Sequence, residues 1–362
     1  MRYKPNLPEA VERMRRLWAM EPPLDRVPCS VRLPAPDPPG GRRPIKDASS
    51  LGDLDGYLSW QAERFRLRAE VPDDWIPTVG PRYGHALISA LCGSPIRVEA
   101  ETTWSVPIIE DWHQVDALRL DFENEWGRRF RAELDVMLDW AAGRCAVEVY
   151  EVEGISDTMS ALRGAERMCT DFHDAPEQAH RFAQKVTDLL IAWGRWNVEN
   201  VGAQQDVGGG ISTGWCLWMP AGSICLAEDA TVLFGPELYR RFILEEERRL
   251  TKAFTRTLLE VHAEGNHQIP EFGDVEGVSM MAIQNPLRMA PEDRDTVKAL
   301  LGRKAFRISC KPDEVEKLLA FMGTRGVYLS LSAGSIREAR ALLGDLERWT
   351  ARHANAPAPT QA

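Results

Sequence analysis

Apolar and polar positions follow two different periods along the chain, most clearly in its second half. Short apolar runs predict strands, and longer stretches with an apolar residue every three or four positions predict amphipathic helices. The predicted strands in this part are residues 145–152, 211–219, 223–227, 257–266, 278–284, 306–310 and 327–331. The predicted helices are residues 124–142, 159–169, 176–200, 236–255, 291–301, 312–322 and 336–352.

Successive strand-helix units predict parallel strands joined by right-handed crossovers. Either an open doubly wound sheet or a closed barrel would satisfy that pattern. Residues 145–352 supply about seven such units, and residues 27–33 supply another strand. The count favours an α/β fold of the closed kind, a (β/α)8 TIM barrel with an N-terminal extension.

The N-terminal part of the chain shows a less regular pattern. We expect residues 1–354 to form one domain, in which residues 1–26 are an N-terminal helix and lead-in and residues 355–362 a disordered tail. Within the lead-in, residues 9–20 are predicted to be helical. Beyond it we predict a loop rich in proline and glycine, a second helix, and a β-rich excursion over the mouth of the barrel, at residues 34–43, 51–69 and 96–109.

The composition is that of a globular protein, with 44% hydrophobic and 27% charged residues. No apolar run approaches the roughly 20 residues that cross a bilayer, and the polar N-terminus lacks a secretory signal, so we expect a cytoplasmic protein. Seven cysteines without a C-x-x-C pair favour reduced thiols. A net charge of −10 argues against binding to nucleic acid or to an anionic membrane. A small-molecule substrate is the better expectation.

Residues 257–266 carry the most chemically equipped of the predicted strand ends. By strand alternation, Leu258, Glu260, His262 and Glu264 share one face, just before a glycine. Strand ends meet at the mouth of a barrel, where such enzymes hold their active sites. Polar side chains also follow the other predicted strands, at Asp157, Glu228 with Asp229, Gln284 with Asn285, and Cys310.

His262 and Glu264 would form half of a site for a divalent metal such as zinc, with Cys310 as third ligand and one position left open for substrate. Without a metal, His262 and Glu264 could act as a general acid-base pair. Simpler interpretations remain open. Asp157 and Asp229 could cap the helices that follow them, His262 and Glu264 could form a structural hydrogen bond, and Cys310 could be a buried apolar residue.

The chain has twelve tryptophans, for which core packing is the default. Trp104, Trp112 and Trp215 could instead face a planar or sugar-like ligand at the mouth. We expect Trp104, Trp215 and Gln284 to contact a cofactor. The run of three glycines at residues 208–210 is read as a loop and not as a phosphate-binding motif, because a helix does not follow it.

Several stretches together resemble the uroporphyrinogen decarboxylase superfamily, which contains the haem-pathway decarboxylase and zinc-dependent, corrinoid-linked methyltransferases. The resemblance covers most of the chain and implies a (β/α)8 barrel. It is carried by residues 25–28 (Asp-Arg-Val-Pro), 156–157, 162–167, 171, 174–177, 228–229, 233–239, 242, 261–265, 311–315 and 326–331.

Departures from the family pattern bear on the subfamily. The arginine-rich motif near the start of the haem-pathway enzyme is missing, and Ser332, Ala333 and Gly334 stand in the late stretch where that enzyme has a histidine. In the methyltransferase branch the strand end is typically His-x-Cys. Here His262 matches, and Glu264 takes the place of the cysteine, so the resemblance implies a zinc site with a harder ligand.

The leading hypothesis is a metal-assisted methyltransferase that uses a corrinoid, or a corrinoid protein, or a small acceptor. His262, Glu264 and Cys310 would bind zinc, and Asp157 and Asp229 would orient the substrate. The alternatives are a metal-free decarboxylase of a carboxylated tetrapyrrole or similar substrate, and a non-catalytic binder of a corrinoid or sugar-like ligand. Relatives in the superfamily make a homodimer an expectation.

Overall fold

The computed structural model describes residues 1–34, 53–81, 83–98 and 103–354. The expected tail at residues 355–362 and most of the expected loop at 34–43 lie outside these ranges. Seven parallel strands form the main sheet, in the order β1-β13-β12-β11-β10-β9-β6. Their bounds are Cys29–Arg32 (β1), Val152–Glu153 (β6), Ile224–Ala227 (β9), Thr257–Glu260 (β10), Val278–Ile283 (β11), Ala305–Ser309 (β12) and Val327–Ser332 (β13).

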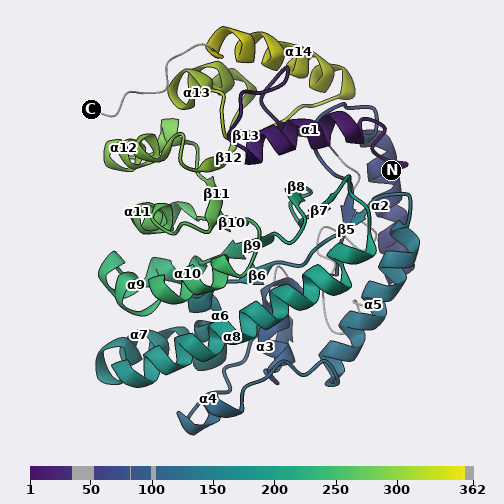
Figure 1. Cartoon of the computed structure of the whole chain (residues 1–362). Helices are drawn as coiled ribbons and strands as arrows, with labels where there is room; N and C mark the ends of the chain where they lie inside the picture. Colours follow the sequence, from purple (N-terminus) through teal and green to yellow (C-terminus); the bar gives the residue numbers. More distant parts are fainter. Residues whose placement is uncertain (35–52, 82, 99–102, 355–362) are drawn as a thin grey trace.

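Helices surround the strands from the outside, as Figure 1 shows for the curved row from α14 to α5. The α-helices are Leu7–Trp18 (α1), Leu54–Arg68 (α2), Leu87–Leu91 (α3), His113–Ala117 (α4), Glu125–Ala141 (α5), Ile155–Arg163 (α6), Ala165–Asp174 (α7), Pro176–Asn200 (α8), Pro236–Phe242 (α9), Leu244–Lys252 (α10), Ile269–Gly273 (α11), Pro291–Leu300 (α12), Val315–Met322 (α13) and Ile336–His353 (α14). Short 3-10 turns are Gly84–Ala86 (η2), Gly202–Gln204 (η3), Asp229–Leu233 (η4), Ala263–Gln268 (η5), Pro286–Arg288 (η6) and Pro312–Glu314 (η7). The strand-helix order of the second half is therefore confirmed.

Three smaller strand pairs accompany the main sheet. Thr78–Val79 (β2) pairs in parallel with Ala146–Val147 (β5), while Ile96–Val98 (β3) with Thr103–Ser105 (β4), and Gly210–Ser212 (β7) with Trp218–Pro220 (β8), form antiparallel hairpins. The single strand expected at residues 145–152 is thus divided into β5 and β6. The strand expected at residues 211–219 is a hairpin, because the chain turns at Cys216, whose φ is +57°.

The described strands confirm the α/β fold and its parallel sheet, but they do not close into a ring of backbone hydrogen bonds. The reason is visible beside β1. The backbone N–H groups of Cys29 and Val31 donate to the carboxylates of Asp74 (2.8 Å) and Asp73 (2.7 Å) and not to a neighbouring strand. These two carboxylates accept the hydrogen bonds that the backbone carbonyl groups of a further strand would otherwise accept at this edge of the sheet.

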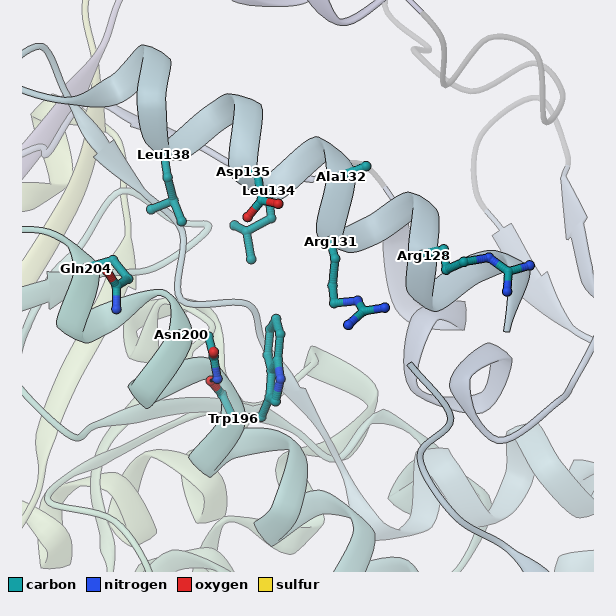
Figure 2. A pocket seen from close by; sticks show the side chains of 9 residues that line it. All are labelled: Arg128, Arg131, Ala132, Leu134, Asp135, Leu138, Trp196, Asn200 and Gln204. Carbon is teal, nitrogen blue, oxygen red and sulfur yellow. Dashed lines mark hydrogen bonds between the residues drawn. The ribbon is translucent and has the colours of Figure 1, made fainter. Parts of the chain in front are cut away.

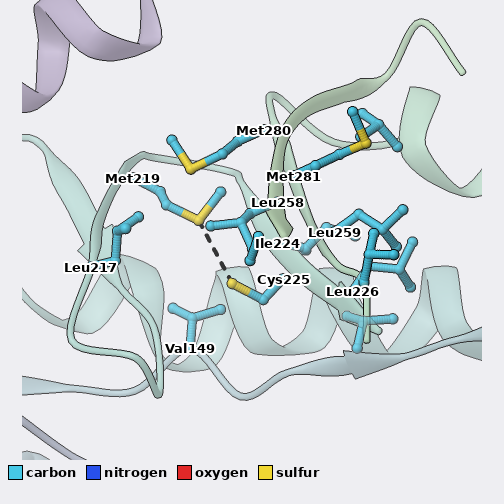
Figure 3. Close-up of a cluster of buried hydrophobic side chains, with 14 of the residues drawn as sticks. Val149, Leu217, Met219, Ile224, Cys225, Leu226, Leu258, Leu259, Met280 and Met281 are labelled. Carbon is cyan, nitrogen blue, oxygen red and sulfur yellow. Dashed lines mark hydrogen bonds between the residues drawn. The ribbon is translucent and has the colours of Figure 1, made fainter. Parts of the chain in front are cut away.

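Strand register arranges the side chains of the sheet in layers. Neighbours in register on parallel strands point to the same face, so they form one layer across the sheet. Cys225, Leu258, Met280 and Ala305 form an apolar layer. Figure 3 shows the first three close to Met219, with a contact of 3.8 Å between the sulfurs of Cys225 and Met219. The sheet therefore has a filled apolar interior below its carboxyl end.

Candidate functional site

The next layer towards the carboxyl ends of the strands is polar. It contains Ala227, Glu260, Ala282, Arg307 and Tyr328, which are in register on five consecutive strands of the sheet. Glu260 and Arg307 are separated only by β11, whose residue in this layer is the small Ala282. A carboxyl group and a guanidinium group thus lie on either side of a small residue in one layer at the mouth of the fold.

Several carboxyl groups gather on the side of this mouth formed by β6, β9 and β10. We call Glu151, Glu153, Asp157, Asp229 and Glu260 the acid cluster. Burial, and then the neighbouring Glu260, raise the pKa of Glu151 to about 8. Burial and the carboxyl of Asp157 raise the pKa of Glu153 well above its usual value. Because like charges in a buried site cannot all ionise, part of the cluster is protonated at neutral pH and can donate protons.

Glu260 occupies the most chemically varied position of the cluster. Burial raises the pKa of Glu260 and the Asp229 carboxylate adds to that rise, whereas His262, Arg307 and His85 oppose it. His85 belongs to the turn η2, which contacts the β3–β4 hairpin. Acid, base and cation thus surround one carboxyl group.

His262 contacts Asp229 and not Glu264. The distance from His262 Nε2 to Asp229 Oδ2 is 3.4 Å, and the other oxygen of Asp229 is buried without a hydrogen-bond partner among the described residues. About half of the His262 side chain is exposed (51%). The pair can take up or release a proton where a substrate has access to it.

Strand alternation gave a wrong position for Glu264. β10 ends at Glu260, His262 precedes the turn η5, and Glu264 lies within that turn with its side chain exposed. The helical turn rotates Glu264 away from the face that Glu260 occupies, because side chains two apart no longer share a face there.

The structure does not bring the three expected zinc ligands His262, Glu264 and Cys310 together. Within the described residues there is no group of three or more His, Cys, Asp or Glu side chains that could hold a metal ion. Burial raises the pKa of Cys310 to about 12. Cys310 follows β12, two strands away from β10 in the sheet. The residues present do not fit the metal.

Asp157 and Glu228 hold two chain segments together. The Glu228 carboxylate accepts hydrogen bonds from the backbone N–H groups of Ile155 (2.5 Å) and Ser156 (3.1 Å) at the start of α6. In the opposite direction, Asp157 accepts from the backbone N–H groups of Asp229 (2.8 Å) and Ala230 (2.9 Å) at the start of η4. Asp157 therefore has a structural role, but it caps the neighbouring turn η4 and not, as the capping interpretation expected, the helix that follows it.

A cavity of about 430 Å³ lies at the carboxyl ends of β1, β12 and β13. Trp215 and Cys310 are among its lining residues, and the guanidinium of Arg307 lies 4.9 Å from the centre of the Trp215 ring. Trp104 lies on β4 with 55% of its surface exposed, and Gln284 is exposed after β11. Neither lines this cavity. Trp112 packs against Phe182 and Arg163 instead of facing a ligand.

A larger cavity of about 510 Å³ lies away from the strand ends, between α5 and the end of α8. Figure 2 shows Arg131 and Leu134 of α5 facing the ring of Trp196 there. Arg131 is paired with Glu123 at 2.6 Å. The charge of Arg131 is thus compensated, and this cavity opens on the outside of the fold, away from the strand ends. We therefore place the chemistry at the mouth, where the strands end.

Sequence reasoning missed Glu151 and Arg307 and gave Glu260 no chemical role. All three interrupt otherwise apolar runs that were predicted to be strands. A charged residue inside such a run is costly unless it faces a polar site, and this is the signal that could have found them.

In the part of the chain that the structure describes, no helix has the length and apolar character to span a membrane.

No model of a known protein family and no curated protein sequence matches the chain. Among solved structures, the chain is similar to a methyltransferase from Methanosarcina mazei, with a TM-score of 0.63, 13% identity, and coverage of 95% of this chain and 98% of that one. It is also similar to a B12-independent methionine synthase from Shewanella sp. W3-18-1, with a TM-score of 0.44, 9% identity, and coverage of 83% and 87%. The first similarity shows that this chain shares the fold of the Methanosarcina methyltransferase along nearly its whole length.

Proposed function

We propose that the chain is an enzyme of methyl-transfer type that acts at the carboxyl ends of its parallel strands. The observation that carries this proposal is the position of Glu260, whose pKa is raised by burial and which stands beside His262 with Asp229 and in one layer with Arg307. The fold shared with a methyltransferase supports it. We further infer that the main sheet is the larger part of a TIM-type barrel, as the resemblance implies.

In the proposed step, the bond between a methyl carbon and a donor oxygen, nitrogen or sulfur breaks. An acceptor, which the resemblance suggests is a corrinoid or a small nucleophile, supplies the electron pair of the new bond to the methyl carbon. The Glu260 carboxyl gives its proton to the donor atom, which leaves as a neutral group. His262 and Asp229 return a proton to Glu260 after the product leaves.

Replacement of Glu260 by glutamine tests this role. We expect the rate of methyl transfer to fall by about 10²- to 10⁴-fold, because the amide cannot donate the proton. The measurement uses ¹³C-methyl donors and cobalamin as the acceptor, with the cobalamin spectrum and the NMR signal of the methyl group as readouts. The matched control is Glu264→Gln, four residues later on an exposed turn, which should leave the rate unchanged. A Glu260→Gln enzyme as fast as the wild type would remove Glu260 from the mechanism.

Decarboxylation is the second candidate function. It is favoured by the same proton donor in one layer with Arg307, a group that can hold a carboxylated substrate. In that reaction a carbon-carbon bond breaks, CO2 leaves, and the Glu260 proton is added to the remaining carbon. Release of labelled CO2 from a carboxylated tetrapyrrole, with no transfer of a methyl group from any donor, would replace the first proposal by the second.

A further inference from the structure

The cavity at the ends of β1, β12 and β13 has an unusual distribution of charge. Its charged lining residues within the described part of the chain are all basic: Arg32, Arg64, Arg68, Arg288, Arg307 and Lys311. The chain as a whole carries a net charge of −10. A local excess of positive charge in an acidic protein points to a ligand of the opposite sign.

Only part of this positive charge is compensated by the protein itself. Arg68 pairs with Asp73 at 2.5 Å and Arg288 pairs with Glu314 at 2.8 Å. Arg32, Arg64 and Arg307 make no ion pair within the described residues. Burial lowers the pKa of Arg64, which donates to the neutral side chain of Gln61 at 2.8 Å. Arg32 is exposed, whereas Arg64 and Arg307 are partly buried. A partly buried cation without a carboxylate is costly, and an anionic ligand would offset that cost.

Hydrogen-bond donors in the cavity also lack partners. Arg307 Nε and Ser330 Oγ are buried and have no hydrogen-bond partner among the described residues. Ser30, Ser309 and Ser332 contribute further hydroxyl groups at the strand ends. Oxygen atoms of a carboxylate or phosphate accept from guanidinium and hydroxyl groups, and the planar guanidinium can bind two of them at once.

The groove between α5 and α8 provides a contrast within the same molecule. It also contains two arginines, but Asp135 lines the groove with them and Glu123 pairs with Arg131 (Figure 2). The presence of arginines therefore does not by itself distinguish the cavity at the ends of β1, β12 and β13, which we call the mouth cavity. Its distinguishing features are the lack of acidic lining residues and the unpaired donors.

We propose that the mouth cavity binds an organic anion with two or more negative charges, carried by carboxylate or phosphate groups, and that this anion is the substrate of the proposed reaction. The second part of this proposal, that the anion is the substrate, rests on the proposed function. Glu260 and Arg307 are two strand spacings apart, roughly 10 Å. An anionic group held by Arg307 would place another part of a small molecule beside Glu260. The volume of about 430 Å³ lies in the range of small-molecule sites.

Calorimetric titration of the full chain tests the binding. The probes are pyrophosphate for phosphate groups and citrate and succinate for carboxylates, each measured at low and high salt. We expect at least one probe to bind and Arg307→Gln to weaken it by about 10- to 100-fold, because charge-assisted hydrogen bonds are lost. Arg64→Gln on α2 should weaken it as well, and it guards against a folding defect caused by a change inside β12. The control Arg131→Gln should bind like the wild type.

Two outcomes would overturn the inference. One is that none of the three probes binds at millimolar concentration to a protein with a normal melting transition. The other is that Arg307→Gln and Arg64→Gln both bind as tightly as the wild type. Because no methyl donor is present, the result is separate from the proposed function. Anion binding without methyl transfer would refute the reaction, and with it the assignment of the anion as its substrate, but not the binding site. Methyl transfer without anion binding would refute only this inference.

Discussion

Replacement of Asp74 by alanine is expected to lower the free energy of unfolding by about 3–5 kcal/mol. Asp74 is fully buried. Its Oδ2 accepts from Arg26 Nη1 at 2.5 Å and from the backbone N–H of Cys29 at 2.8 Å, and its Oδ1 accepts from Arg13 Nη1 at 3.1 Å. The alanine variant would leave the guanidinium of Arg26, which is itself buried, without its carboxylate. It would also remove the acceptor at the edge of β1.

Urea unfolding of the wild type and the variant measures this loss. The matched control is Asp116→Ala, since Asp116 pairs with Arg181 at 3.0 Å on the surface and 70% of its side chain is exposed. We expect that change to cost less than about 1 kcal/mol. The double variant Arg26→Met with Asp74→Leu should lose less stability than Asp74→Ala, because it leaves no unpaired charge. Equal unfolding midpoints for the wild type and Asp74→Ala would contradict the prediction.

The second large effect concerns pH and Glu148. Burial raises the pKa of Glu148 from 4.5 to about 8. The folded state therefore holds this proton more tightly than the unfolded chain does. The resulting stabilisation is complete below pH 4.5 and is lost as the pH rises through about 8, with a slope of about 1.4 kcal/mol per pH unit. Glu151 and Glu228, with pKa values of about 8, contribute with the same sign.

The substitution Glu148→Gln should make stability fall less steeply between pH 4.5 and 8, because it removes one of these groups and keeps its shape. The shape matters, since a Cβ added at Gly80 would lie 2.1 Å from Glu148 Oε2 and one at Gly214 would lie 2.4 Å from Oε1. Denaturant midpoints measured across this pH range give the slope. Glu166→Gln, at an exposed position on α7, should leave the slope as in the wild type. Identical slopes for the wild type and Glu148→Gln would show that Glu148 ionises freely in the folded state.

The residues of the resembling motifs have different roles in the structure. Arg26 belongs to the stretch at residues 25–28, and Asp157 to the stretch at residues 156–157. Arg26 forms a buried ion pair with Asp74, and Asp157 caps a turn. Similarity of sequence thus marked residues that stabilise the fold as well as residues at the mouth. Only their contacts in the structure distinguish the residues that stabilise the fold from the residues at the mouth.

The amino-acid sequence by itself determined most helices and the parallel strand order of the second half, although the single helices expected at residues 159–169 and 236–255 are each divided into two. α8 has the predicted bounds, Pro176–Asn200, and α14 spans Ile336–His353 where 336–352 was expected. Such elements follow from periods of three to four residues and from short connections, which are properties of neighbouring residues. The polar ends of the strands could be read from the chain for the same reason.

The tertiary structure alone decided which polar residues meet. Glu264 was predicted beside His262, but the turn η5 begins just after His262, and Asp229 of a different segment lies at 3.4 Å from His262 instead. Arg64 of α2 and Arg307 of β12 line one cavity although they are far apart in the sequence. Such contacts depend on strand register and on the packing of separate segments. A shift of one residue in the register of a strand would direct its side chains to the opposite face. The residues that form the mouth of this protein are therefore separate in the sequence, and only the tertiary structure brings them together.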